Sequence, residues 1–116
     1  MTSEIVILQP KTVLADPHDC TDAKDTLSMM HAVFDTLVMR GAAGFVPGLA
    51  LSWTCAEDAR AWRFRLRAGV VFHDGTACDA EAVVQSLRRM ARADKGYTLG
   101  SPGVWHQYLG DARIAV

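Results

Sequence analysis

The chain has 116 residues, with 12 Lys and Arg against 13 Asp and Glu and a formal net charge of −1 at pH 7. This length suits one domain and is short for two. Domains that bind nucleic acid usually carry an excess of basic residues, so the charge balance argues against that class of partner. The apolar runs are far shorter than the ~20 residues that span a bilayer, and we therefore predict no transmembrane helix.

The N-terminal third predicts a strand followed by an amphipathic helix. Residues 4–8 form a short β-branched run that stops before Pro10, which predicts a strand. The Asp16-Pro17 pair predicts an extended or turn conformation. Between residues 22 and 38, apolar side chains recur at helical spacing, and Thr21 or Asp22 provides a cap. These apolar residues are Leu27, Met30, Phe34 and Leu37.

The middle of the chain predicts an antiparallel hairpin. An apolar segment at residues 49–54 is followed by a polar, turn-like stretch at residues 57–60. Residues 61–67 then alternate strictly, which is typical of a strand with one buried face. Trp62, Phe64 and Leu66 lie on its apolar face, and Arg63, Arg65 and Arg67 lie on the other. We interpret the arginine face as solvated, as charged outer faces of such strands usually are.

A turn and a capped helix follow the hairpin. Residues 70–72 are a brief extended piece, and residues 73–76, with the sequence HDGT, predict a turn in which Gly75 takes a positive φ. Asp79 is a good N-cap for a helix that runs to about residue 93. The remaining residues, 94–116, predict a long loop with one helical turn near residues 105–109 and the first residues of a strand at 113–116.

Cysteine and histidine patterns give weak evidence for chemistry. Cys20, Cys55 and Cys78 are an odd set without C-x-x-C spacing, which fits three ordinary thiols or one disulfide. The four histidines have no metal-site spacing, so we predict neither a metal nor a cofactor. One alternative is a small metal-dependent cytosolic enzyme that uses His73 and Asp74 with Cys78. No nucleophile elbow and no phosphate-binding loop supports it, and we predict no catalytic residues.

Three stretches, taken in order, resemble one family. LADPHD at residues 14–19 is similar to a family segment LDPH, and VFDTLV at residues 33–38 is similar to the end of its first helix. FVPGLALSWTCAEDARAWRFRLRAGVVFHDGTACDAEAVVQSLRRM at residues 45–90 is similar to its long signature. The chain thus resembles the extracellular solute-binding proteins of family 5, the peptide- and nickel-binding subunits of ABC transporters. Departures include Ala59 in place of a usual glycine, an Ala-Cys-Asp sequence at residues 77–79 in place of Pro-Leu-Thr, and Ala82 in place of Asp.

The resemblance implies an α+β fold, the N-terminal part of the first lobe of a two-lobe periplasmic binding protein (type II, cluster C-like), with a β-hairpin followed by a helix. Residues 1–116 would form a single partial domain without the second lobe. It also implies no enzymatic activity and two segments near ligand. Asp19, Cys20 and Thr21 would offer extended backbone to a ligand main chain, and Gly103 holds the position of a family aromatic whose role Trp105 or Tyr97 would take over.

The implied function is the substrate-binding component of an ABC importer, most simply for peptides, delivering ligand to a membrane permease. The alternatives within the family are nickel or another small solute, and a further reading is a ligand sensor fused to a regulatory domain. The implied location is periplasmic or extracytoplasmic, at the membrane through the transporter, with an export signal encoded upstream of Met1. Because a lobe cut inside a strand exposes a sheet edge, we also expect self-association.

Overall fold

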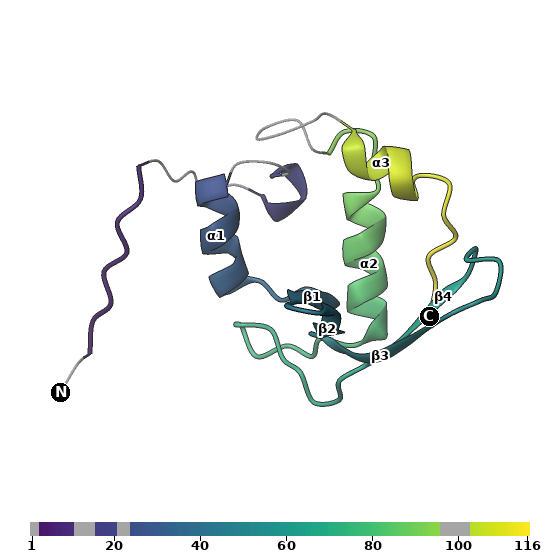
Figure 1. Ribbon diagram of the computed structural model, residues 1–116, viewed down its shortest axis with the longest axis horizontal. Coiled ribbons are helices and arrows are strands. Elements are labelled where there is room, and N and C mark those ends of the chain that lie inside the picture. The colour runs from purple at the N-terminus through teal and green to yellow at the C-terminus, as the bar shows by residue number, and fades with distance from the viewer. Residues whose placement is uncertain (1–2, 11–15, 21–23, 96–102) are drawn as a thin grey trace. The chain divides into compact units, whose positions relative to one another are not determined.

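The computed structural model describes residues 3–10, 16–20, 24–95 and 103–116 (Figure 1). Its elements are η1 (Pro17–Asp19), α1 (Lys24–Val33), β1 (Val38–Gly41), β2 (Gly44–Pro47), β3 (Ala50–Cys55), β4 (Trp62–Leu66), α2 (Ala80–Met90) and α3 (Val104–Leu109). The chain forms two compact units, Met1–Val33 with Arg89–Ala112 and Phe34–Arg88 with Arg113–Val116. Helices and antiparallel hairpins confirm the α+β class. Within the described ranges, no helix has both the length and the apolar character needed to cross a membrane.

Helix α1 ends at Val33, five residues before the predicted end. The backbone beyond α1 makes hydrogen bonds to a later segment in place of helical ones. The Thr36 carbonyl accepts from Leu49 N at 2.8 Å, and the Leu37 carbonyl accepts from Ala50 N at 2.9 Å. A Cβ on Gly48 would collide with the Thr36 carbonyl oxygen, so the close approach of these two backbone segments requires glycine at residue 48. The predicted cap at Thr21 or Asp22 lies outside the described residues.

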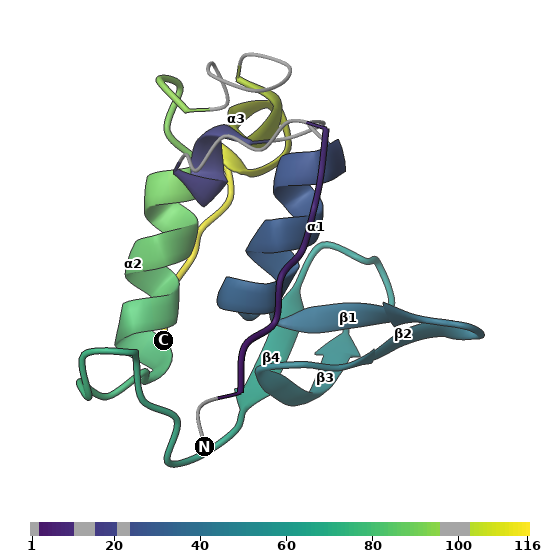
Figure 2. The same cartoon turned by 90° about the vertical axis from the view of Figure 1, so that its left-hand side faces the viewer.

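The hairpin of β1 and β2 was not predicted from the sequence. The strands pair antiparallel from Val38 opposite Pro47 to Gly41 opposite Gly44, around a two-residue turn (Figure 2). The Arg40 guanidinium lies 5.9 Å from the centroid of the Phe45 ring across the hairpin. The sequence predicts helix as far as Val38, because a short apolar segment of this kind fits the spacing of both a helix and a strand.

The second hairpin, β3 with β4, confirms the predicted antiparallel pair. Trp53 lies opposite Phe64 and Cys55 opposite Trp62, with a register shift between Ala50 and Ser52. The expected burial of the apolar face is wrong, because Trp62 is 56% exposed and Phe64 is 37% exposed. Sequence alternation fixes which side chains share a face, whereas burial requires another element to pack on that face.

The turn and the capped helix after β4 are confirmed. Gly75 has φ +84°, and Phe72 N donates to Thr76 O at 2.8 Å. Asp79 caps α2, since its Oδ1 accepts from Ala82 N at 2.9 Å. The helix ends at Met90, three residues earlier than predicted. The predicted helical turn near residue 105 is also confirmed, as α3.

Neither predicted terminal strand is present. Residues 4–8 and 113–116 are assigned to no strand, and no strand in the described part of the chain pairs with them. In the first segment Ile5 is 87% exposed and Leu8 is 90% exposed. A strand is defined by its partner's hydrogen bonds, so a β-branched run without a partner remains an extended segment.

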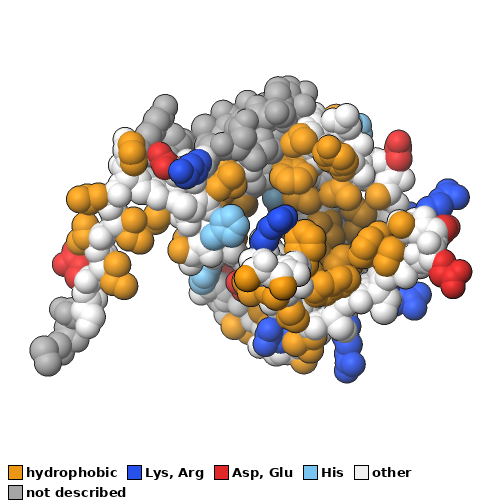
Figure 3. Space-filling view, in the orientation of Figure 1, with side chains coloured by type: hydrophobic (Ala, Val, Ile, Leu, Met, Phe, Trp, Pro, Cys, Tyr) orange, Lys and Arg blue, Asp and Glu red, His pale blue; other side chains and the backbone are white. Residues whose placement is uncertain are grey.

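Few side chains are buried in either unit. Cys20 and Met30 are the buried hydrophobic residues described in the first unit, and Ala50 and Val84 are those in the second. Figure 3 shows many hydrophobic side chains at the surface, including some along the extended N-terminal segment. Large apolar side chains that stay exposed in this way are available for packing against other protein.

Ala59, in the turn between β3 and β4, has a positive φ of +56°, which is unusual for a residue other than glycine. Its N–H donates to Ala56 O at 2.9 Å, which fixes the turn. The left-handed conformation costs an L-residue about 1–2 kcal/mol, and glycine avoids this cost. The backbone is therefore strained at Ala59, the position where the family usually has glycine.

We expect Ala59→Gly to raise the free energy of unfolding by about 1 kcal/mol, measured by urea denaturation followed by tryptophan fluorescence. Ala56→Gly, at the other side of the same turn, is the matched control. Ala56 has no positive φ, so this variant is expected to lower the stability slightly. A loss of stability in Ala59→Gly would contradict the strain.

Candidate functional site

Asp16 folds residues 16–20 into a tight turn in the first unit. Its Oδ1 accepts from His18 N at 3.0 Å, and its carbonyl accepts from Asp19 N at 2.9 Å. Cys20 N donates to Pro17 O at 3.4 Å. Asp19 is therefore part of the 3-10 helix η1, which corrects the prediction of extended backbone there, whereas Cys20 is extended at φ −102°, ψ 112°.

Two basic side chains hold this turn by its acidic residues. Arg89 binds Asp16 in bidentate fashion, with Nη1 donating to Oδ1 at 2.9 Å and Nη2 donating to Oδ2. Lys95 Nζ lies 3.3 Å from Asp16 Oδ2 and 3.5 Å from Asp19 Oδ2. Because a guanidinium fork matches a carboxylate in geometry, the Arg89 pair fixes the orientation of the Asp16 side chain as well as its position.

The charges of this cluster reinforce one another. The Arg89 hydrogen bond holds the pKa of Asp16 far below its usual range, and Asp16 in turn raises the pKa of Arg89. Burial and the nearby Arg89 charge lower the pKa of His18. A neutral His18 can accept at Nδ1, which lies 2.7 Å from Arg89 Nη1. The cluster is thus arranged for an ionised Asp16 and an uncharged His18 at neutral pH.

Lys95 also connects this turn to the second predicted ligand segment. Gly103 N donates to Lys95 O at 3.1 Å, and Gly103 O accepts from Gln107 N in the first turn of α3. Gly103 has φ +68°, and an added Cβ would meet open space, so glycine is needed here for its conformation. Four predicted residues, Asp19, Cys20, Gly103 and Trp105, therefore lie in the same unit, while Thr21 and Tyr97 lie outside the described residues.

Trp105 offers an unusual hydrogen-bond donor. The side chain is partly exposed, but its Nε1 is buried and has no acceptor among the residues that the structure describes. A buried indole N–H normally finds a partner. Cys20, in contrast, is buried as a whole residue, at 2% exposure, and contributes packing.

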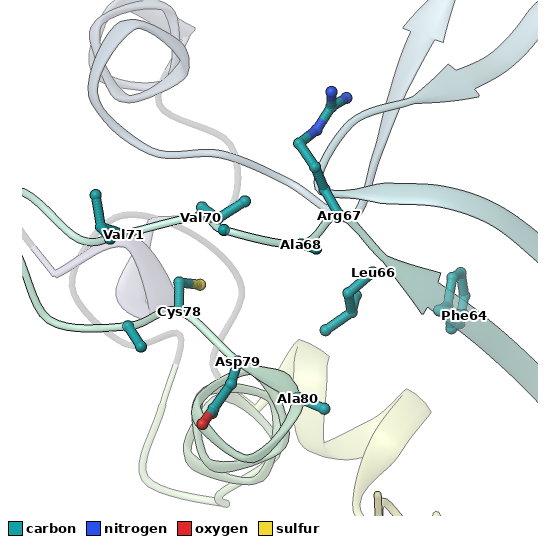
Figure 4. A pocket seen from close by; sticks show the side chains of 11 residues that line it. Phe64, Leu66, Arg67, Ala68, Val70, Val71, Cys78, Asp79 and Ala80 are labelled. Carbon is teal, nitrogen blue, oxygen red and sulfur yellow. The ribbon is translucent and has the colours of Figure 1, made fainter.

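The second unit contains an apolar pocket that includes none of the predicted ligand residues. Its volume is about 420 Å³, and it is lined by Phe64, Leu66, Arg67, Ala68, Gly69, Val70, Val71, Ala77, Cys78, Asp79 and Ala80. Figure 4 shows the Leu66 side chain and the Cys78 thiol directed into this space, with the Arg67 guanidinium and the Asp79 carboxylate directed away. The pocket thus has an apolar interior and charged margins.

The residues near this pocket do not support the alternative hypothesis of an enzyme that uses His73 and Asp74 with Cys78. The Asp74 carboxylate accepts from Thr76 N at 2.9 Å and from Thr76 Oγ1 at 2.7 Å, so it stabilises the turn. Burial raises the pKa of the Cys78 thiol, the opposite of what an activated nucleophile needs. Cys20, Cys55 and Cys78 are all free. Among the described residues, no three His, Cys, Asp or Glu side chains are grouped as metal ligands.

Comparison with known proteins identifies the family. The sequence profile of the bacterial extracellular solute-binding proteins, family 5 Middle, matches residues 44–107, more than half of the chain. The chain belongs to this family. The matched residues include the hairpin of β3 and β4, the turn at Gly75 and helix α2, which the sequence patterns also predicted.

Several curated family 5 proteins are similar to the chain. The nickel-binding periplasmic protein of Escherichia coli is 46% identical over 57 residues, which cover 48% of this chain and 11% of that protein. Di/tripeptide-binding protein 1 of Pseudomonas aeruginosa is 38% identical over 60 residues, 50% of this chain and 11% of that protein. The dipeptide-binding protein of Escherichia coli is 33% identical over 76 residues, 60% of this chain and 14% of that protein.

The chain thus matches only about a tenth of the length of these family 5 relatives. No solved structure gives a significant match. The match to family 5 therefore rests on sequence, and the geometry at Asp16 and Lys95 is what the structure adds to it.

The basic half of the site was not predicted from the sequence. Arg89 and Lys95 were not singled out, although LADPHD drew attention to their acidic partners. Arg89 lies on a helix, 73 positions from Asp16, and no local pattern connects them. The one available signal is that Asp16 and Asp19 form a small acidic pair, which is costly to pack without a nearby cation.

We expect Asp16→Asn to lower the free energy of unfolding by about 2 kcal/mol at pH 7, because it removes a charge-assisted bidentate contact. The pKa of Asp16 is lowered on folding, so its stabilising effect is full above the ordinary Asp pKa of about 3.9 and is lost as the pH falls through the lower folded value.

The difference between Asp16→Asn and the unsubstituted chain should therefore shrink from pH 7 to pH 3, as measured by urea denaturation at each pH. Asp111→Asn removes an exposed carboxylate outside this cluster and serves as the control, with little change expected at either pH. A difference that stays constant with pH would show that Asp16 does not act through its charge.

Proposed function

We propose that the chain is part of the substrate-binding component of an ABC importer for peptides. The family match supports the solute-binding role. Two of the relatives described above are named as di/tripeptide-binding and dipeptide-binding proteins. A further relative in Escherichia coli, 35% identical over 57 residues, carries the name of a probable D,D-dipeptide-binding periplasmic protein.

In this proposal the complete protein is exported, encloses a peptide between two lobes and delivers it to a membrane permease. Peptides of varied sequence share only their backbone and their charged ends. A receptor for them therefore needs main-chain hydrogen bonds, which ignore side-chain identity, and roomy side-chain pockets. Two lobes joined by a hinge allow both entry and full enclosure of such a ligand.

The observation that carries the proposal is the connection between the two predicted ligand segments. Asp19 and Gly103, which the family resemblance assigns to ligand contact, are both bonded to Lys95. The Trp105 indole N–H is buried and has no acceptor among the described residues, so it would donate to a peptide carbonyl only if the side chain turned outward on binding. The N–H groups of Asp19 and Cys20 already donate within the turn, so a peptide would pair with other groups of this segment.

Nickel uptake is the second candidate, favoured by the 46% identity to a nickel-binding relative. Ni²⁺ prefers imidazole and other N or O ligands in a fixed geometry. The part of the chain that the structure describes contains no cluster of three such side chains. A nickel ion would therefore need ligands from elsewhere in the protein or from a bound chelator.

Calorimetric titration of the product of the complete gene tests these candidates, with a dipeptide, a tripeptide and Ni²⁺ as separate ligands. We expect peptide binding, and we expect Trp105→Phe to weaken it by about tenfold through loss of one buried hydrogen bond. Trp62→Phe is the matched control, because the Trp62 indole donates to Ala59 O at 3.2 Å within its own turn. Binding of Ni²⁺ without peptide binding would favour the second candidate, and binding of none would reject both.

We also infer that the isolated chain self-associates. Ile5, Val6, Ile7 and Leu8 are all well exposed on a segment without a described strand partner. Such an apolar extended segment is a template for pairing with another chain. Sedimentation velocity should show species larger than a monomer at high concentration, and replacing Ile5 and Ile7 with Asp should shift them toward the monomer. A clean monomer of the unsubstituted chain would contradict the inference.

A further inference from the structure

Lys95 has an arrangement that a surface lysine does not normally show. Its side chain is 14% exposed, whereas the nearby Arg92 side chain is 60% exposed. Fixing a long flexible side chain costs conformational entropy. An ammonium group that is also withdrawn from water needs anionic partners to compensate. The carboxylates of Asp16 and Asp19 supply them, at 3.3 and 3.5 Å.

The main chain of Lys95 is equally engaged. Its N–H donates to Arg92 O at 3.2 Å, and its carbonyl accepts from Gly103 N at 3.1 Å. The side chain thus contacts the turn at residues 16–20, and the backbone contacts the residue that precedes α3. All of these residues belong to the first unit.

Arg89 does not have this double role. It binds Asp16 and His18 through its side chain, but no described contact links it to Gly103 or Trp105. Its side chain is 44% exposed. Arg89 therefore fixes the turn itself, whereas Lys95 sets the distance between the turn and the segment that begins at Gly103.

We propose that Lys95 is the positioning residue of the ligand site, holding the Asp16–Asp19 turn and the Gly103–Trp105 segment at the spacing that a bound peptide requires. This rests on the proposed function. In this role Lys95 does not touch the peptide. It holds the turn at residues 16–20 and the segment that begins at Gly103 together, and removal of its charge loosens one segment from the other.

The test uses the product of the complete gene with Lys95→Met, which removes the charge and keeps the apolar stem. We expect the dissociation constant for a dipeptide to rise about tenfold, corresponding to ~1.4 kcal/mol. Hydrogen exchange at the Asp19 and Cys20 amides should become faster, because their turn has lost an anchor. Lys95→Arg keeps a cation at this place and should restore most of the affinity.

Arg92→Met is the matched control, since Arg92 pairs with the exposed Asp94 at 2.7 Å outside the site. It should leave both readouts unchanged. A lower thermal midpoint in Lys95→Met with an unchanged dissociation constant would show a purely structural role and overturn the proposal. If the unsubstituted protein binds no peptide, the proposed function fails. The exchange rates then still decide whether Lys95 anchors the turn, and unchanged rates would reject that.

Discussion

The carboxylate of Asp16 is the contact on which the first unit depends. It accepts from the His18 N–H within its own turn, from both terminal nitrogens of Arg89 and from Lys95. One side chain therefore satisfies a local backbone donor and joins residues more than 70 positions apart. Each of these bonds is stronger with an ionised acceptor, so the low pKa of Asp16 and the stability of the turn have the same physical origin.

This reliance on charge-assisted bonds accords with the small amount of buried apolar surface. Few described hydrophobic residues of this unit are buried, and Ile5 and Leu8 remain almost fully exposed. Hydrophobic burial is the main favourable term in folding and scales with the area removed from water. A unit that buries little apolar surface depends more strongly on directional contacts such as those of Asp16.

The contacts of Lys95 connect the family assignment with the geometry of the candidate site. A receptor that recognises main chain must hold its own backbone segments at fixed spacing, because a hydrogen bond weakens within a few tenths of an ångström. In the proposed peptide receptor, Lys95 holds two such segments, one through its side chain and one through its carbonyl.

The sequence by itself determined the elements whose signals are local. Strict alternation predicted β4, Gly75 and Asp79 predicted the turn and the cap of α2, and the ordered motifs identified the family. The tertiary structure alone decided what depends on partners distant in the chain. It ended α1 at Val33, before the Thr36 carbonyl that bonds to Leu49, left residues 4–8 without a strand partner in the described part of the chain, and brought Arg89 to Asp16. Backbone preference is encoded within a few residues, whereas pairing and charge contacts exist only once the chain has folded.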